Sequence, residues 1–471
     1  MDEVETSDGE ILVRRRPCRR VGQILLAAAL TFTAACGGSE SSDPSDDSGN
    51  GSAVVDTEAD EIITDDSAAE PGTGDPVDGE AVDGEVGDGD DVEESADGET
   101  ADEPESGRTG AGNRTNNRNK AGSDDDQESS GRATNTSEVT AGITRVAASR
   151  MAGARVLCSF TEAAVPPSVL DAIRDGRASG VLLFADNVPS QEQAVANGDA
   201  IQEAAAASPS GAPAIVAIDQ EGGIVKRIPG PPSASAEEMG AWSSDEIRAE
   251  AQATGDLIRA WGSNLDLAPV ADVARPGGFI DRQSRSFGSD LATAADGVVA
   301  FTEGLRLAGV GSTLKHFPGL GSATLNTDDS VSVVETAPGD LWSIDFIPFA
   351  SGINVGADVV MMASAVYPVV DERPAVYSEV WVDDVLRGEL GFEGVVISDA
   401  LDTPALAAAG GVGARAVEAA KAGVDLFIAA SPGACDRIHS ALTDAIRSGE
   451  LAEIASKASV RRIGALRRSL G

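Results

Sequence analysis

The chain has 471 residues and a formal net charge of −43, which makes a nucleic-acid partner unexpected, because an acidic surface repels phosphate backbones. Its length accommodates two or three average domains, or one large barrel with extensions. The charge is concentrated in residues 40–131, where 30 acidic and 4 basic residues give a net charge of −26. The remainder of the chain is acidic as well, which we interpret as an aid to solubility.

Residues 1–36 have the pattern of an export signal. The basic stretch RRRPCRR (14–20) precedes the apolar run VGQILLAAALTFTAAC (21–36), which is short for a membrane span but typical of a signal peptide. The sequence around Cys36 resembles a bacterial lipobox, so we predict that Cys36 is lipidated and anchors the protein to a membrane. Cleavage after Ala35 would instead release a soluble exported protein.

Residues 37–140 are predicted to form a disordered linker. They consist almost entirely of Gly, Ser, Asp, Glu, Thr, Asn and Ala, and they show no hydrophobic periodicity. Such a segment buries too little apolar surface to offset the entropy that ordering would remove. We interpret it as an acidic tether that holds the folded domain away from a membrane.

Residues 141–471 are predicted to fold as one α/β domain, a (β/α)8 barrel of the TIM type. Short apolar runs bounded by turns are typical of strands buried on both faces, and helical patterns lie between them. The alternative, an open doubly wound sheet, usually carries a Gly-rich loop after its first strand, and residues 159–167 lack one. The eight apolar runs cover residues 154–160, 180–185, 214–219, 265–272, 310–317, 357–364, 394–399 and 424–430.

Polar residues follow these runs at the strand ends where barrels of this type place their active sites. The domain has only two histidines, His316 and His439, and therefore lacks the histidine cluster of a zinc hydrolase. Lys315 at a strand end would suit a Schiff-base aldolase, but no phosphate-binding loop accompanies it. The polar residues are Asp219, Gln220, Glu221, Asp272, Lys315, His316, Ser364, Ser398, Asp399 and Ser431, with Arg285 in a following loop.

A cavity lined by carboxylates, hydrogen-bond donors and cations would suit a sugar, because such groups form hydrogen bonds with its many hydroxyl groups. Cleavage of a glycoside needs one carboxylate as nucleophile and a second group as acid and base. The inventory of strand ends therefore favours a glycosidase.

Five motifs follow one another in this domain: AIDQEGGIVKRI (217–228), LAPVADV (267–273), RSFGSD (285–290), KHFPG (315–319) and LRGELGFEGVVISDAL (386–401). Together they resemble glycoside hydrolase family 3, and in particular its single-domain β-N-acetylglucosaminidase branch. The resemblance covers about residues 145–470. It implies a retaining mechanism through a glycosyl-enzyme intermediate, and it implies no metal and no organic cofactor.

The resemblance also assigns roles to individual residues. Asp399 would be the nucleophile, and its position at the end of an apolar strand agrees with this role. Arg227 matches the arginine after EGG and would contact the substrate. The residues that would bind the hydroxyl groups of the sugar are Asp219, Arg285, Lys315 and His316.

The sequence departs from the family pattern directly after KHFPG. The branch usually reads KHFPGHG followed by Asp-Ser-His, and that last histidine is the general acid/base. Here Leu320 replaces the first of these histidines, residues 326–328 read Asn-Thr-Asp, and Ile224 replaces the arginine of the common EGGR form. Three interpretations stay open. In the first, which we favour, Asp328 (or Asp329) is the acid/base. In the second, an acidic residue of another loop takes this role. In the third, the domain binds sugar without turnover.

Two cysteines lie in the folded domain, in a chain that we expect to be exported and therefore able to keep disulfides. Cys158 is late in the first predicted strand, and Cys435 follows the eighth. The first and last strands of a closed barrel are neighbours, so we predict a disulfide between Cys158 and Cys435.

From the sequence we thus expect an exported glycosidase that cleaves terminal β-N-acetylglucosaminides of cell-wall or chitin fragments. The sequence leaves two alternatives. One is a β-glucosidase or β-xylosidase of the same family, and the other is a sugar-binding lipoprotein without catalysis.

Overall fold

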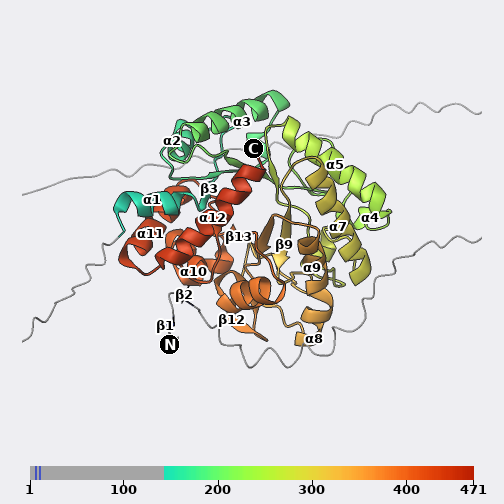
Figure 1. The fold of residues 1–471 in the computed structure, drawn as a ribbon. Helices are drawn as coiled ribbons and strands as arrows, with labels where there is room; N and C mark the ends of the chain where they lie inside the picture. Colours follow the sequence, from blue (N-terminus) through green and yellow to red (C-terminus); the bar gives the residue numbers. More distant parts are fainter. Residues whose placement is uncertain (1–5, 8–9, 12–142) are drawn as a thin grey trace, which may run out of the picture. The chain divides into compact units, whose positions relative to one another are not determined.

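The computed structural model describes residues 6–7, 10–11 and 143–471 (Figure 1). Strands β1 (Thr6–Ser7) and β2 (Glu10–Ile11) form a short antiparallel pair. Apart from this pair, the predicted signal peptide and linker, with Cys36, lie outside the described residues. Among the residues that are described, no helix combines the length and apolar composition needed to cross a membrane.

Eight parallel strands form one sheet that closes almost completely into a barrel, which confirms the predicted eight-strand arrangement. The order around the sheet is β8-β5-β4-β3-β14-β13-β10-β9, and isolated parallel bridges between Leu265 and Gly311 and between Val270 and Lys315 join its two edges. The strands are β3 (Val156–Cys158), β4 (Gly180–Leu183), β5 (Ile215–Ile218), β8 (Leu265–Asp266), β9 (Thr313–Phe317), β10 (Val359–Met362), β13 (Val395–Ala400) and β14 (Leu426–Ile428).

The fourth barrel strand is shorter than the predicted run 265–272, because β8 ends at Asp266. Pro269 lies in the middle of the run and has no N–H group to donate to a neighbouring strand. The chain nevertheless stays beside β9, since the Thr313 N–H donates to the Ala268 carbonyl at 2.8 Å. The barrel therefore closes through an irregular segment rather than through a regular strand pair.

Helices connect successive strands and surround the sheet (Figure 1). Their ends follow the sequence: α2 has Pro167 in its first turn, and α5 begins with a capping box between Ser243 and Glu246. The helices are α1 (Arg145–Gly153), α2 (Pro167–Arg174), α3 (Gln191–Ala206), α4 (Ala236–Met239), α5 (Ser244–Ala260), α6 (Phe279–Arg282), α7 (Leu291–Leu307), α8 (Pro338–Asp340), α9 (Phe346–Asn354), α10 (Val412–Lys421), α11 (Ala434–Ser448) and α12 (Glu453–Ser469).

The loops contain short strands and single helical turns. Two short antiparallel pairs follow barrel strands: β6 with β7 after β5, and β11 with β12 after β10. These and the remaining helical turns are β6 (Gln220–Gly222), β7 (Val225–Lys226), β11 (Val366–Tyr367), β12 (Asp371–Pro374), η2 (Ala185–Asn187), η3 (Leu341–Asp345), η4 (Ala375–Tyr377), η5 (Val380–Glu389) and η6 (Pro404–Ala409).

The core has two layers, because alternate residues of each strand point to opposite faces of the sheet. In β3, Leu157 belongs to the cluster inside the barrel, whereas Val156 and Cys158 belong to the cluster between sheet and helices. Helix α12 adds Ile463 and Leu466 to the inner cluster, near the amino-terminal ends of the strands. That end of the barrel is thus filled with apolar side chains.

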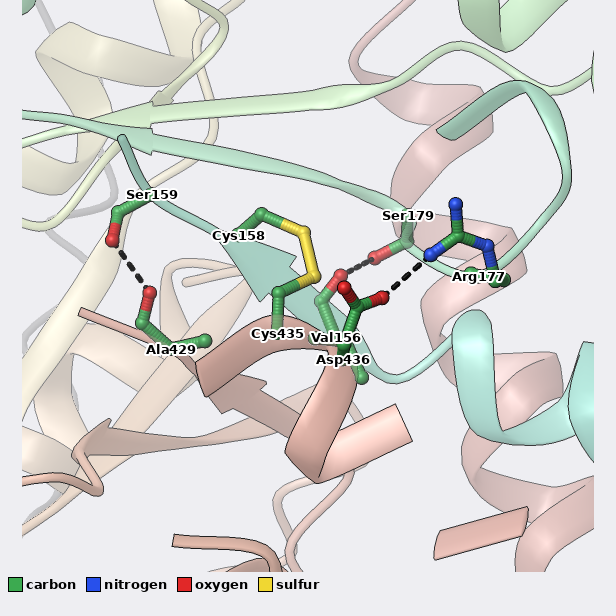
Figure 2. Close-up of a disulfide and its surroundings, with 8 residues drawn as sticks. All are labelled: Val156, Cys158, Ser159, Arg177, Ser179, Ala429, Cys435 and Asp436. Atoms are coloured by element: carbon green, nitrogen blue, oxygen red, sulfur yellow. Dashed lines mark hydrogen bonds and ion pairs between the residues drawn. A yellow bond between two sulfur atoms is a disulfide. The ribbon is translucent and has the colours of Figure 1, made fainter. Parts of the chain in front are cut away.

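The first and last parts of the domain are joined covalently. Cys158 on β3 and Cys435 at the start of α11 form a disulfide with a Cα–Cα distance of 5.1 Å (Figure 2). Figure 2 also shows Arg177 paired with Asp436 beside it. Because 277 positions separate the two cysteines, the link constrains a very long segment of the unfolded chain.

We expect replacement of both Cys158 and Cys435 by serine to lower the free energy of unfolding by about 2–4 kcal/mol, because the unfolded chain regains conformational entropy. Thermal unfolding of the full chain with and without a reductant measures this effect. Proteolytic mapping without reduction should recover a peptide pair linked through these two residues. Two free thiols in the mature protein would refute the disulfide.

Candidate active site

A cavity of about 570 Å³ opens at the carboxyl ends of the barrel strands. Leu182 from β4, Met361 from β10 and Ile428 from β14 form part of its apolar base. All residues that the sequence assigned to catalysis or sugar binding line this one cavity, namely Asp219, Arg227, Arg285, Lys315, His316, Asp328 and Asp399.

A buried ion network occupies one side of the cavity. Lys315 Nζ lies 2.8 Å from Asp219 Oδ1 and 2.6 Å from Glu221 Oε1. Arg285 binds Glu221 through two parallel contacts of 2.8 Å, and Arg227 Nη2 lies 3.2 Å from Asp219 Oδ2. The side chains of Lys315 and Glu221 are each only 3% exposed, so their charges are compensated by each other rather than by water.

The network fixes the protonation states of its members. Burial alone would raise the pKa of Asp219, but the Lys315 and Arg227 charges outweigh it and lower that pKa. Burial opposes ionisation of Glu221 too, yet Arg285 and Lys315 hold its pKa well below the usual range. Burial lowers the pKa of Lys315, and the two carboxylates more than reverse this, so its pKa is raised. These groups are therefore charged at neutral pH.

The protonated state of Lys315 bears on the aldolase alternative. A Schiff-base lysine must lose its proton to act as a nucleophile. Here the ammonium group is held between two carboxylates, and its pKa is raised rather than lowered. The geometry instead suits a hydrogen-bond donor to a polar ligand.

His316 is oriented by Asp272, which the sequence indicated only as a polar residue at a strand end. Asp272 Oδ2 lies 2.8 Å from His316 Nδ1, and Asp272 Oδ1 accepts hydrogen bonds from the N–H groups of His316 (3.1 Å) and Leu320 (2.6 Å). Because a carboxylate oxygen only accepts hydrogen bonds, we assign the proton of this contact to Nδ1. Nε2 of His316 then remains for a ligand in the cavity.

Asp399 and Asp328 lie outside this network. Asp399 is on β13, where its Oδ1 accepts a hydrogen bond of 2.8 Å from the Ala400 N–H. Asp328 lies in the loop after β9 and is exposed at the cavity. Loss of hydration and, after it, the nearby Asp399 carboxylate raise the pKa of Asp328. Together they outweigh His316, which lowers this pKa. The neighbouring Asp329 does not line the cavity and bonds to Asn326 instead.

The structure also contains site residues that the sequence had not singled out as such. Glu221 was noted only as a strand end, and nothing in the sequence shows that it bridges Lys315 and Arg285. Asp402 lines the cavity three residues after Asp399, and only this short spacing could have indicated it. Other polar strand ends do not line the cavity, and Gln220 instead holds the following loop through the carbonyls of Ile228 and Pro231.

A nearly closed α/β barrel that gathers carboxylates and fixed cations around a cavity at its strand ends has the layout of an enzyme active site. Comparisons with known proteins narrow the class of enzyme. The family model of the glycosyl hydrolase family 3 N-terminal domain matches residues 161–466. This chain belongs to glycosyl hydrolase family 3 and is a glycosidase.

Individual relatives agree with this assignment. An uncharacterised secreted glycosyl hydrolase from Arthroderma benhamiae is 37% identical over 330 residues, which are 68% of this chain and 93% of that protein. A β-hexosaminidase from Xanthomonas campestris pv. campestris is 39% identical over 273 residues, 56% of this chain and 80% of its own length. The crystal structure of a β-N-acetylhexosaminidase from Beutenbergia cavernae superposes with a TM-score of 0.63 at 31% identity, covering 68% of this chain and 98% of the other.

We expect the variant Glu221→Ala to lower the free energy of unfolding by about 3–5 kcal/mol, because Lys315 and Arg285 lose a buried counter-charge. Urea-induced unfolding of the full chain measures this effect. The matched control is Glu450→Ala, which removes a pair with Lys421 on the surface and should change stability by less than about 1 kcal/mol. Equal stability of both variants would contradict the buried network.

Proposed function

We propose that the protein is a β-N-acetylhexosaminidase that cleaves terminal β-N-acetylglucosaminides with retention of configuration. The observation that carries the proposal is the pair of Asp399 and Asp328 at one cavity, where loss of hydration and then the Asp399 carboxylate raise the pKa of Asp328. A retaining glycosidase needs one ionised carboxylate and one protonated acid at such a site. The relatives that are named hexosaminidases support the choice of sugar.

In the proposed mechanism Asp399 attacks the anomeric carbon while Asp328 gives its proton to the glycosidic oxygen. The leaving group departs as an alcohol, and the sugar stays bonded to the Asp399 carboxylate. Asp328, now ionised, takes a proton from water, and the resulting hydroxide attacks the same carbon and releases Asp399. Two further cavity carboxylates, Asp219 and Glu221, are unsuited to proton transfer because adjacent cations lower their pKa values.

The ion network would hold the sugar during these steps. Lys315 has three ammonium protons, of which two meet Asp219 and Glu221, so one remains for a sugar hydroxyl. Nε2 of His316 and the second lone pairs of the Asp219 oxygens provide further partners. Because these groups are already fixed by their mutual ion pairs, little entropy is lost when they bind a ligand.

We further propose that the protein is exported and anchored through Cys36. The sequence pattern of residues 14–36 supports this, and the Arthroderma benhamiae relative is described as secreted. In a bacterial host, the wild-type protein should partition into the detergent phase and Cys36→Ser into the aqueous phase. Partitioning of both into the aqueous phase would remove the lipid anchor from the proposal.

The proposed activity is tested with paired nitrophenyl glycosides, the β-N-acetylglucosaminide against the β-glucoside. We expect the full chain to prefer the first substrate, and Asp399→Ala to reduce kcat by roughly a thousandfold or more, because the nucleophile is lost. Preference for the glucoside would favour the β-glucosidase alternative. A folded wild-type protein that binds sugar but hydrolyses neither substrate would favour a binding protein.

The role of Asp328 has its own signature. A general acid must be protonated, so we expect wild-type activity to fall as the pH rises through the raised pKa of Asp328, and Asp328→Asn to lack this alkaline limb. The variant should lose roughly a hundredfold or more on a glycoside with a poor leaving group. On a nitrophenyl glycoside, whose nitrophenolate leaves without a proton, kcat/KM should fall much less, whereas kcat still falls because Asp328 is also the base of the second step. Full activity of Asp328→Asn on the poor leaving group, with an unchanged pH profile, would exclude the role.

A further inference from the structure

Asp402 is a cavity carboxylate for which the mechanism has no use. It lines the cavity and is partly buried, and its side chain makes no hydrogen bond or ion pair with any described residue. Asp219 and Glu221 are neutralised by cations, whereas Asp399 and Asp328 have chemical roles. A partly buried charge without a partner is unfavourable unless something else supplies that partner. In a cavity of this kind a bound ligand can supply that partner.

The next residue, Thr403, also has a side-chain oxygen that is unpaired among the described residues, but this one belongs to a hydroxyl group that can donate a hydrogen bond. Thr403 is 9% exposed, and its Oγ1 has no hydrogen-bond partner in the described part of the chain. It precedes η6, where a threonine hydroxyl often caps the first turn, but no such bond is made here. An ionised carboxylate only accepts hydrogen bonds, whereas a hydroxyl can also donate one. Asp402 and Thr403 therefore offer an acceptor and a donor side by side.

The turn that carries both residues is held in place by Arg415. Its Nη1 donates to the carbonyl of Leu401 at 2.8 Å and to the carbonyl of Thr403 at 2.9 Å. The Leu401 side chain is fully buried, and the preceding Asp399 is fixed in β13. The backbone of this turn is thus preorganised beside the cavity.

We propose that Asp402 and Thr403 bind the 2-acetamido group of the sugar. A secondary amide carries one donor and one acceptor: Asp402 accepts a hydrogen bond from the amide N–H, and Thr403 donates one to the amide carbonyl. Carbon 2 is bonded to the anomeric carbon that Asp399 attacks, and Asp399 lies on the strand that leads into this turn. This inference rests on the proposed function and assigns its preference for N-acetylated sugars to named residues.

The test compares the full-length wild type with Asp402→Ala, Asp402→Asn and Thr403→Val on the two nitrophenyl glycosides. For Asp402→Ala we expect the ratio of kcat/KM between the N-acetylglucosaminide and the glucoside to fall roughly tenfold to a hundredfold. Asp402→Asn should recover part of this ratio, because its amide oxygen still accepts a hydrogen bond. The matched control is Asp199→Ala, an exposed position on α3 that should leave the ratio unchanged.

The same variants are tested without turnover by calorimetric titration with N-acetylglucosamine and with glucose. If the wild type hydrolyses neither glycoside but prefers N-acetylglucosamine, and Asp402→Ala loses that preference, the recognition stands while the proposed function fails. Equal losses for both sugars in Asp402→Ala, or no loss for either, would overturn the recognition. Melting temperatures identify any variant that is merely unfolded, and Thr403→Val then provides an independent measure.

Discussion

The site depends on the ion pairs that the Lys315 ammonium group forms with two buried carboxylates, those of Asp219 and Glu221. Lys315 on β9 meets Asp219 at the end of β5 and Glu221 on β6, and so ties together two sides of the closing barrel. None of these three charges could remain buried alone, because the loss of hydration is too unfavourable without a counter-charge. Arg285 adds a loop after β8 to the same network. The network is therefore both a structural link and a preformed set of hydrogen-bonding groups at the cavity.

The same network divides the acidic residues of the cavity into two groups. Asp219 and Glu221 lie against cations that keep them ionised, and they cannot exchange protons at neutral pH. Asp328 lies instead where loss of hydration and the charge of Asp399 favour its protonated form. Residues of one chemical type thus take different roles according to the charges around them. In the proposed mechanism this environment is what allows a carboxyl group to take the place of the family's usual histidine, because it raises the pKa of Asp328.

The two ends of the barrel differ in a way that directs function to one of them. Apolar residues of α12 fill the end where the strands begin, while polar side chains gather where the strands end. The disulfide between Cys158 and Cys435 and the contact of α1 with α11 join the first and last parts of the domain (Figure 1, Figure 2). These links hold the first and last strands of the barrel together beneath the cavity. The loops after β9 and β13, which carry Asp328 and Asp402, extend from this base.

The sequence by itself determined the eight barrel strands, because strands buried on both faces require continuous apolar runs. It also determined the strand ends that carry Asp219, Lys315 and Asp399, because these polar residues end the runs. The presence of Asp328 where the family usually has a histidine was visible in the sequence as well. Only the tertiary structure decided that Glu221 bridges two cations, that Asp272 orients His316, and that Asp402 has no partner among the described residues. These relations depend on distances between residues far apart in the chain. Such distances follow from barrel closure and side-chain packing, which no local pattern encodes.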